Sequence, residues 1–242
     1  MVHSIPSQRA AKILLTRPQR QSERFADILH KQLGDHLEIE ISPILEIRFI
    51  DPEVDLTRVD GLVFTSENGV SGLARVTPRR DLAAYCVGDR TAEVAREAGF
   101  EARSAHGDVD ALAEMLVRSA GGKTLLYARG KHIARDLQPM LGCACIDLNE
   151  TVVYDQAELP LSEVARALLA GTDPVLIPLF SPRSARLLCQ SLDRSSTAPC
   201  VALCLSKAVA EGCPPGLFDV IAISGAPNLQ SMVELIKRYC SH

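Results

Sequence analysis

The sequence predicts an α/β fold with parallel sheets, and two patterns support this prediction. Short apolar runs alternate along the chain with segments whose apolar residues recur at helical spacing. The alternation restarts roughly 110 residues further on, which predicts two copies of one α/β unit. The length of 242 residues is long for one typical domain and suits two domains of about 120 residues.

The first copy is expected to begin with a strand and a long helix. The apolar run at 13–16 predicts the strand. A helix is expected over 22–33, because apolar residues such as Phe25 and Leu29 recur at helical spacing and Gly34 is a typical stop. The extended stretch that follows, 38–49, is unusually long and is interrupted by Pro43.

Three further strands, each followed by a helix, are expected in the first copy. Apolar runs predict strands over 61–64, 83–87 and 101–104. One helix should begin in the turn 65–70 and continue through Leu73, and the next should cover 91–98 and end at Gly99. A third helix is expected over 109–119, where Asp108 is a favourable N-cap.

The second copy repeats these markers in the same order. Residues 123–126 echo 12–15, and each segment is followed by a basic stretch, a helix and a glycine, Gly34 or Gly142. Each copy then enters a long extended stretch, 39–49 or 145–155. The remaining paired segments are 64–70 with 179–185, 86–88 with 204–206, and 110–112 with 228–230.

The two long extended stretches allow two interpretations. Each has about twice the usual strand length, so each strand could start in one domain and end in the other, with the copies exchanging their first βα units. The alternative is a strand followed by a loop, which the break at Pro43 suits and which the sequence alone favours. Pro178 lies within another expected strand, which should therefore be irregular or lie at an edge.

Composition and charge exclude several classes of protein. With 26 Lys and Arg against 30 Asp and Glu, the net charge is −4, which argues against a nucleic-acid partner. The absence of Trp, with only 6 Phe and 4 Tyr, leaves few stacking platforms for bases. No apolar run approaches the roughly 18 residues of a membrane span, and the N-terminus has no apolar signal segment. The eight cysteines are therefore expected to be reduced thiols in the cytoplasm.

Residues at the strand ends are the candidates for ligand binding, because ligands of parallel sheets lie beyond the carboxyl ends of the strands. Backbone N–H groups at the following helix starts attract carboxylates or phosphates, although a Ser or Thr there is more often only an N-cap. Arginine suits bidentate carboxylate binding. The turn residues are Thr16, Thr65, Ser66, Gly88, Thr91, Ser181, Ser206, Ser224 and Gly225, and the arginines are Arg17, Arg129, Arg135 and Arg183.

Common catalytic motifs are not found. The sequence has no Gly-x-Ser-x-Gly elbow, no phosphate-binding Gly-Lys-Ser/Thr loop and no Gly-x-Gly-x-x-Gly. The six histidines do not pair at metal-ligand spacing, and the pair Cys143 and Cys145 matches no zinc signature, so no metal is expected. Tyr154 lies near the end of the second long stretch, where its ordinary role would be packing.

Six motifs together resemble the uroporphyrinogen-III synthase family in its bacterial form. Each motif is short, but they occur in the family's order and cover nearly the whole chain. The motifs are Leu-Leu-Thr-Arg-Pro at 14–18, Val-Phe-Thr-Ser-Glu-Asn-Gly-Val at 63–70, Val-Gly-Asp-Arg-Thr-Ala at 87–92, Val-Val-Tyr at 152–154, Phe-Ser-Pro-Arg-Ser-Ala at 180–185, and Leu-Ser-Lys-Ala-Val-Ala at 205–210.

The resemblance implies an enzyme of tetrapyrrole (haem) biosynthesis. It would be a cofactor-independent hydro-lyase, and a monomer, that closes the linear polycarboxylate hydroxymethylbilane to uroporphyrinogen III with inversion of ring D. The implied fold has two flavodoxin-like parallel-sheet domains with exchanged segments, joined by a two-stranded antiparallel ladder, with the active site in the cleft between them. The expected domains are 1–42 plus 157–242 and 48–150, with connecting strands at 43–47 and 151–156.

The resemblance also implies roles for individual residues. Tyr154 matches the family tyrosine and is the expected general acid. The expected substrate-binding residues are Thr16, Arg17, Thr65, Ser66, Asn68, Gly88, Thr91, Arg129, Gly130, Ser181, Arg183 and Ser206. Two alternatives remain: a two-lobed module that binds a small anion or a tetrapyrrole without catalysis, and a degenerate family member retained as a protein partner.

Overall fold

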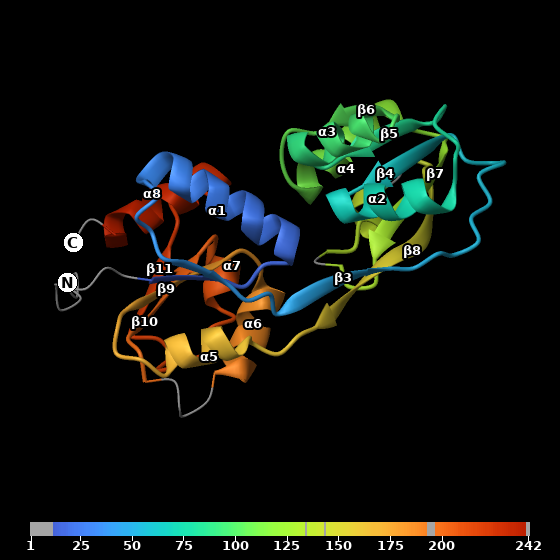
Figure 1. Ribbon diagram of the computed structural model, residues 1–242. Helices are drawn as coiled ribbons and strands as arrows, with labels where there is room; N and C mark the ends of the chain where they lie inside the picture. Colours follow the sequence, from blue (N-terminus) through green and yellow to red (C-terminus); the bar gives the residue numbers. More distant parts are fainter. Residues whose placement is uncertain (1–11, 134, 143, 193–196, 241–242) are drawn as a thin grey trace. The chain divides into compact units, whose positions relative to one another are not determined.

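The structure is a computed structural model that describes residues 12–133, 135–142, 144–192 and 197–240 (Figure 1). The chain divides into two compact units. Unit 1 contains the residues up to Glu46 and those from Glu158 onward, and unit 2 contains Ile47–Ala157. Both boundaries fall within strands, so the chain passes from one unit to the other twice in extended conformation.

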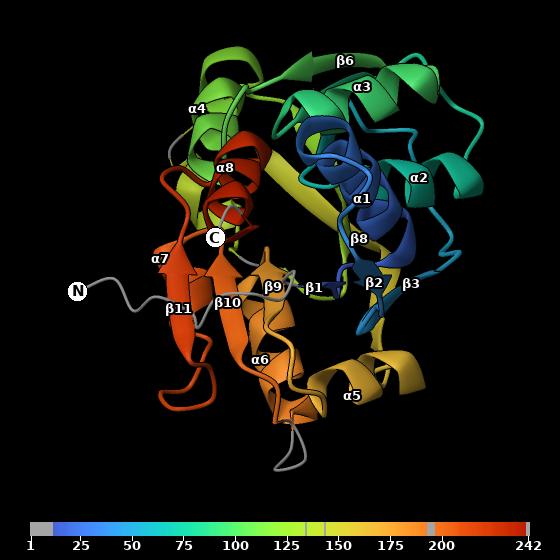
Figure 2. The same cartoon turned by 60° about the vertical axis from the view of Figure 1, so that its left-hand side comes forward.

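Unit 1 is built on a five-stranded parallel sheet with the strand order β11-β10-β9-β1-β2. Strands β9, β10 and β11 lie side by side in Figure 2. Figure 1 shows α1 and α8 on one side of this sheet and α5 and α6 on the other. The strands are β1 (Lys12–Leu15), β2 (Ile39–Ile41), β9 (Val175–Leu179), β10 (Cys200–Cys204) and β11 (Val220–Ile223), and the helices are α1 (Gln19–Leu33), α5 (Glu163–Leu169), α6 (Pro182–Ser191), α7 (Lys207–Ala210) and α8 (Leu229–Cys240).

Unit 2 is built on the sheet with the strand order β3-β8-β7-β4-β5-β6, in which β8 to β6 run parallel. One core cluster lies between the sheet and the helices α2 and α3, and a second lies under α4 and η1. The strands are β3 (Leu45–Phe49), β4 (Gly61–Phe64), β5 (Ala83–Cys86), β6 (Glu101–Ser104), β7 (Thr124–Gly130) and β8 (Asp147–Glu158), and the helices are α2 (Glu67–Val76), α3 (Asp89–Glu97), α4 (Val109–Ser119) and η1 (Gln138–Leu141).

The predicted strands and helices of the first copy are confirmed, with ends that move by a few residues. Asp108 caps α4 as expected, since its carboxylate accepts from the backbone N–H groups of Asp110 and Ala111. In the second copy the helix expected before Gly142 is wrong, because only the four-residue 3₁₀ helix η1 forms there. Pro139 lies in its first turn, and the Asp136 carboxylate accepts from the Gln138 N–H, which favours a tight turn.

The second long extended stretch is a continuous strand of twelve residues, β8, so the loop that the sequence alone favours there is wrong. In the first stretch the break at Pro43 is real, because β2 ends at Ile41 and β3 begins at Leu45. Ile44 accepts from the N–H of Leu159, and the N–H of Ile50 donates to Val153. The partners advance in opposite directions along the chain, so β3 and β8 are antiparallel.

The strand that contains Pro178 does not lie at an edge, which corrects one of the two expectations for it. This strand, β9, lies between β10 and β1. Its pairing with β10 extends from Val175 to Leu179, whereas its pairing with β1 stops at Leu176. The backbone groups of successive residues in a strand point alternately to its two neighbours, and those of Val175 and Leu179 bond toward β10. The backbone nitrogen of Pro178 therefore faces β1, where the pairing has already ended, and no hydrogen bond is lost there.

Candidate active site

In unit 2 the predicted site residues meet at one edge of the sheet. Strands β8, β7, β4 and β5 are consecutive neighbours and run parallel, so their carboxyl ends lie together. The residues at this edge are Tyr154, where the pairing of β8 with β7 ends, Arg129 and Gly130 on β7, Thr65, Ser66 and Asn68 after β4, and Gly88 and Thr91 after β5.

A β-bulge places Tyr154 directly opposite Gly130. Arg129 pairs with Val152, but Gly130 pairs with Tyr154, so Val153 is an extra residue on β8. As a result, the consecutive residues Val153 and Tyr154 both belong to the core under α2. A Cβ atom on Gly130 would lie 2.6 Å from Cζ of Tyr154 and 2.9 Å from its hydroxyl oxygen, so the phenol ring occupies the space that a side chain at position 130 would need.

The hydroxyl of Tyr154 is held at the start of α2. Ser66 is the N-cap of this helix, and its Oγ accepts from the backbone N–H of Asn68 at 3.1 Å. Tyr154 is only 7% exposed, and this burial raises the pKa of its phenol, while the side-chain hydrogen bond with Ser66 lowers the pKa by less. Tyr154 is therefore a neutral phenol, and a proton donor, throughout the physiological pH range.

Helix α2 approaches the strands closely enough to make this contact. A Cβ atom on Gly69 would lie 2.5 Å from the carbonyl oxygen of Ala128, and one on Gly72 would lie 2.7 Å from the side chain of Val153. The two glycines are three residues apart and so share one face of the helix. Their lack of side chains brings the helix start, with Ser66, down onto β7 and β8.

Tyr127 belongs to this edge, although it was not predicted. It lies on β7, is 2% exposed, and its hydroxyl oxygen lies 2.7 Å from Oγ1 of Thr65. Burial raises the pKa of its phenol, while the bond with Thr65 acts in the opposite direction. In the sequence Tyr127 directly follows the apolar run that ends at 126, and this pattern is shared by tyrosines that only pack, so it does not single out Tyr127.

Arg129 stiffens the same edge through an ion pair. Its Nε donates to Oε2 of Glu150 on the neighbouring strand β8 at 2.7 Å, and one of its Nη atoms donates to the Gly130 carbonyl oxygen at 2.9 Å. The guanidinium thus neutralises Glu150 and braces the backbone at the residue that faces Tyr154. Its contacts with β8 and Gly130 are those of a brace for the end of β7.

The start of α3 lies at the end of β5. Gly88 is the N-cap residue in extended conformation, and Thr91 is buried in the first turn of the helix. Nδ1 of His106, from the loop after β6, lies 2.6 Å from Oδ1 of Asp89. A hydrogen bond from Ser104 and the proximity of His106 lower the pKa of Asp89. The first turn of α3 thus carries a carboxylate, as does the first turn of α2, where Glu67 lies.

Unit 1 presents a second set at the carboxyl ends of β1, β9 and β10. Ser181 caps α6, because its Oγ accepts from the N–H of Ser184 at 3.1 Å, and the two serine hydroxyls lie 2.8 Å apart. Ser206 is the N-cap residue of α7, which has only four residues. Thr16 is 1% exposed and its carbonyl accepts from the N–H of Ile44.

Two arginines flank Ser181. The guanidinium of Arg17 lies 4.1 Å from the centre of the Phe180 ring, which in turn meets Phe25 edge to face. Nη2 of Arg183 lies 3.3 Å from Oε1 of Glu158. The predicted residues therefore form two sets, one at the strand ends of each unit.

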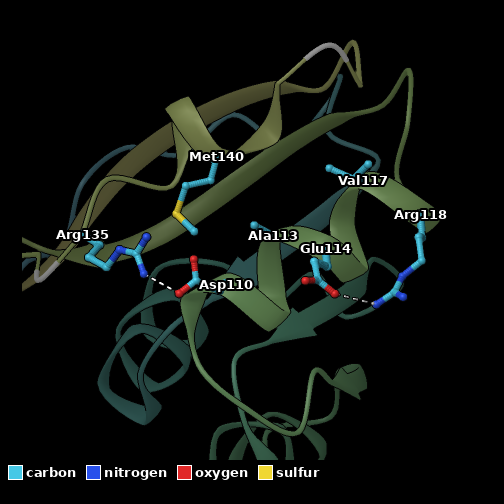
Figure 3. Close-up of a pocket in the computed structure, with 7 residues that line it drawn as sticks. All are labelled: Asp110, Ala113, Glu114, Val117, Arg118, Arg135 and Met140. Atoms are coloured by element: carbon cyan, nitrogen blue, oxygen red, sulfur yellow. Dashed lines mark hydrogen bonds and ion pairs between the residues drawn. The ribbon is translucent and has the colours of Figure 1, made fainter. Parts of the chain in front are cut away.

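Figure 3 shows a cavity of about 430 Å³ in unit 2, lined by residues of α4, of η1 and of the segment between β7 and η1. Its charged groups are engaged in ion pairs, Arg135 with Asp110 and Arg118 with Glu114. The lining residues, all from the described part of the chain, are Asp110, Ala113, Glu114, Val117, Arg118, Arg135 and Met140, and none is among the expected substrate-binding residues. The cavity therefore does not mark the candidate active site.

Comparison with known proteins decides the family. The family model described as "Uroporphyrinogen-III synthase HemD" matches residues 25–234. The chain belongs to the uroporphyrinogen-III synthase family. Uroporphyrinogen-III synthases are cyclising lyases of tetrapyrrole synthesis that act on hydroxymethylbilane, and the chain is an enzyme of this class. The resemblance carried by the six motifs is confirmed.

Solved structures agree with the family. The uroporphyrinogen-III synthetase from Helicobacter pylori matches with a TM-score of 0.66 at 19% identity, over 93% of this chain and 98% of that chain. A mutant uroporphyrinogen III synthase from the extremely thermophilic bacterium Thermus thermophilus matches with a TM-score of 0.51 at 15% identity, over 96% and 99%. At these identities the likeness shows a shared uroporphyrinogen-III synthase fold. No curated protein matches the sequence.

Every helix of the described residues is too short or too polar to cross a bilayer. In the same residues, no three or more His, Cys, Asp or Glu side chains are grouped so that they could hold a metal ion.

Proposed function

We propose that this uroporphyrinogen-III synthase uses Tyr154 as its proton donor and the turns at the strand ends as carboxylate clamps. The reaction closes hydroxymethylbilane to uroporphyrinogen III, with loss of water and inversion of ring D. The observation that carries the proposal is the placement of Tyr154, whose ring lies over Gly130 and whose hydroxyl is bonded to the cap residue of α2.

The first chemical step is the departure of the ring A hydroxyl group. When the C–O bond breaks, the oxygen takes the phenol proton of Tyr154 and leaves as water, and the substrate becomes an electrophilic, protonated azafulvene beside the phenolate. Ring D attacks through its substituted carbon, and the resulting spiro intermediate fragments and recloses. The proton released when the last ring regains aromaticity restores the phenol. Because a phenol is a weak acid, we expect a modest share of the rate enhancement from this group.

Most of the catalysis is expected to come from holding a flexible chain in one geometry. The substrate carries eight carboxylates, and helix starts with hydroxyl caps offer N–H and O–H donors to such groups. The proposed clamps in unit 2 are Thr65, Ser66, Asn68, Gly88, Thr91, Arg129 and Gly130, and those in unit 1 are Thr16, Arg17, Ser181, Arg183 and Ser206.

We also propose that both units are flavodoxin-like domains that have exchanged segments. The parallel strands of unit 1 have the order 2-1-3-4-5 if they are counted as β1, β2, β9, β10 and β11. Those of unit 2 have the same order if they are counted as β7, β8, β4, β5 and β6, with the antiparallel β3 left out at the edge. The exchanged units are then β1-α1-β2 and β7-η1-β8. The proposed domains are 1–42 plus 157–242 and 48–150, with connecting strands at 43–47 and 151–156. Family membership supports a cytoplasmic monomer that needs no cofactor.

Tyr154→Phe tests the proposed proton donor. We expect kcat for type III formation to fall about tenfold or more, with a small change in KM, because only the proton donor is lost. The matched control is Tyr85→Phe, which removes a hydroxyl from another buried tyrosine of unit 2. Wild-type turnover by Tyr154→Phe, with an unchanged unfolding midpoint, would overturn the assignment.

A further inference from the structure

We infer that Tyr127 is a positioning residue for this reaction, which acts by orienting the hydroxyl of Thr65 toward a substrate carboxylate. The inference rests on the proposed function, because it assumes that Thr65 is a clamp. The observation behind it is the 2.7 Å hydrogen bond between the Tyr127 hydroxyl and Oγ1 of Thr65, which joins residues 62 positions apart.

The register of the sheet explains why Tyr127 reaches Thr65. Tyr127 on β7 pairs with Val63 on β4, and Val63 belongs to the same core cluster. Thr65 lies two residues beyond Val63, just past the end of β4 and on the same side of the strand, because side chains alternate. The phenol ring fills the core beside Val63 while its hydroxyl extends to the turn.

The same turn is held from both faces of the sheet. Thr65 is bonded to Tyr127, which belongs to the core under α4, whereas the next residue, Ser66, is bonded to Tyr154, which belongs to the core under α2. The consecutive hydroxyl residues Thr65 and Ser66 thus each interact with a different tyrosine.

The chemistry of the bond gives Tyr127 its role. A phenylalanine would fill the core equally well, so the buried hydroxyl serves only its hydrogen bond. Either hydroxyl can donate in this bond, and the proposal has Tyr127 as the donor. Thr65 is partly exposed, and its hydroxyl then keeps its own hydrogen for another acceptor. A substrate carboxylate, which can only accept, is the matching partner. Tyr127 therefore sets the direction of one substrate contact without touching the substrate.

The test compares Tyr127→Phe with Tyr85→Phe as a matched control. Tyr85 is buried in the same cluster and pairs with the same Val63 from the other side, but its ring lies against Gly61 at the opposite end of β4. With hydroxymethylbilane as substrate, we expect Tyr127→Phe to raise KM about threefold to tenfold with a smaller change in kcat. Tyr85→Phe should stay within about twofold of the wild type in both constants.

A double-mutant cycle separates positioning from general stability. Thr65→Val removes the same bond from its other end, so Tyr127→Phe added to Thr65→Val should cause no further rise in KM. Independent losses in the double variant, or wild-type constants for Tyr127→Phe, would overturn the inference. Tyr154→Phe distinguishes the two proposals. If Tyr154→Phe loses turnover while Tyr127→Phe keeps the wild-type KM, only the role of Tyr127 fails, and if Tyr154→Phe is fully active, the proposed function itself fails.

Discussion

Gly130 decides where the phenol of Tyr154, the proposed proton donor, lies. The space that a Cβ atom would need is filled by the ring of Tyr154, with contacts as short as 2.6 Å. Real Cβ atoms are not found this close to other heavy atoms, so any side chain at this position must push the ring away. The hydrogen bond between Tyr154 and Ser66 then has to lengthen or break.

Gly130→Ala should therefore lower activity without unfolding the enzyme. We expect kcat to fall about tenfold to a hundredfold, because a displacement of about 1 Å in a catalytic group is costly. Steady-state kinetics beside a thermal melt would measure both effects. The control is Gly121→Ala, whose added Cβ would come no closer than 3.5 Å to the nearest atom. Equal activities for the two variants would show that the contact with Gly130 does not position Tyr154.

The sequence alone reaches some residues of the site and not others. Ser66 and Ser181 could be predicted because a hydroxyl residue between a strand and a helix is a recognisable cap, and both cap their helices. Tyr127 could not be predicted as a site residue, since a tyrosine in an apolar strand has the same pattern as one that only packs. The bulge opposite Gly130 depends on the register between two strands, which no local pattern in the sequence reveals.

At the scale of elements, α2 joins the turn at Thr65 and Ser66, the proposed carboxylate clamp, to the strand that carries Tyr154. Gly69 and Gly72 allow its backbone to lie directly on β7 and β8. Glycine is a poor helix former, and replacing it with alanine in an exposed helix usually stabilises the helix by about 1 kcal/mol. In α2 the packing contact outweighs this propensity.

Gly72→Ala should therefore destabilise the enzyme, although helix propensity alone would predict that this substitution stabilises it. We expect a loss of about 1–3 kcal/mol in the free energy of unfolding, because the added methyl group overlaps Val153. Urea denaturation gives this value directly. Ser71→Ala, on the same helix, should be close to neutral. A stabilised Gly72→Ala variant would mean that α2 does not rest on β8 in this way.

Two elements show where sequence patterns stop predicting structure. Pro178 suggested an edge strand, yet β9 is central, because the missing donor falls where pairing with β1 has already ended. The basic stretch after β7 suggested a helix, yet only one 3₁₀ turn forms, because Pro139 and the Asp136 cap favour a tight turn. The first outcome depends on a neighbouring strand that lies far away in the sequence, and the second depends on residues that favour a turn over a helix.

For the whole molecule, buried thiols couple stability to alkaline pH. Burial raises the pKa of Cys86 and Cys204 to about 12 and that of Cys200 to about 11, compared with an ordinary value of 9.0. In the folded state these groups keep their protons at a pH where the unfolded chain loses them. The contribution of these buried thiols to stability is complete below about pH 9, and it is lost as the pH rises toward the pKa values that the thiols have in the folded state.

The free energy of unfolding should therefore fall steadily above about pH 9. Each such thiol contributes a slope of about 1.4 kcal/mol per pH unit. Denaturation curves between about pH 8 and pH 10.5 would show whether Cys204→Ala reduces the slope by this amount. Cys145→Ala, at an exposed position, provides the comparison and should leave the slope unchanged. An unaltered slope for Cys204→Ala would contradict the burial of that thiol.

The central claim is that this chain directs the cyclisation of hydroxymethylbilane and does not merely bind a tetrapyrrole. Hydroxymethylbilane closes spontaneously to the type I isomer, so the isomer composition of the product separates catalysis from binding. The most direct measurement is the ratio of type III to type I uroporphyrinogen formed with the wild-type chain, with Tyr154→Phe and without protein. The account predicts mainly type III with the wild type and a marked shift toward type I with Tyr154→Phe. A wild-type ratio equal to that of the protein-free control would contradict it.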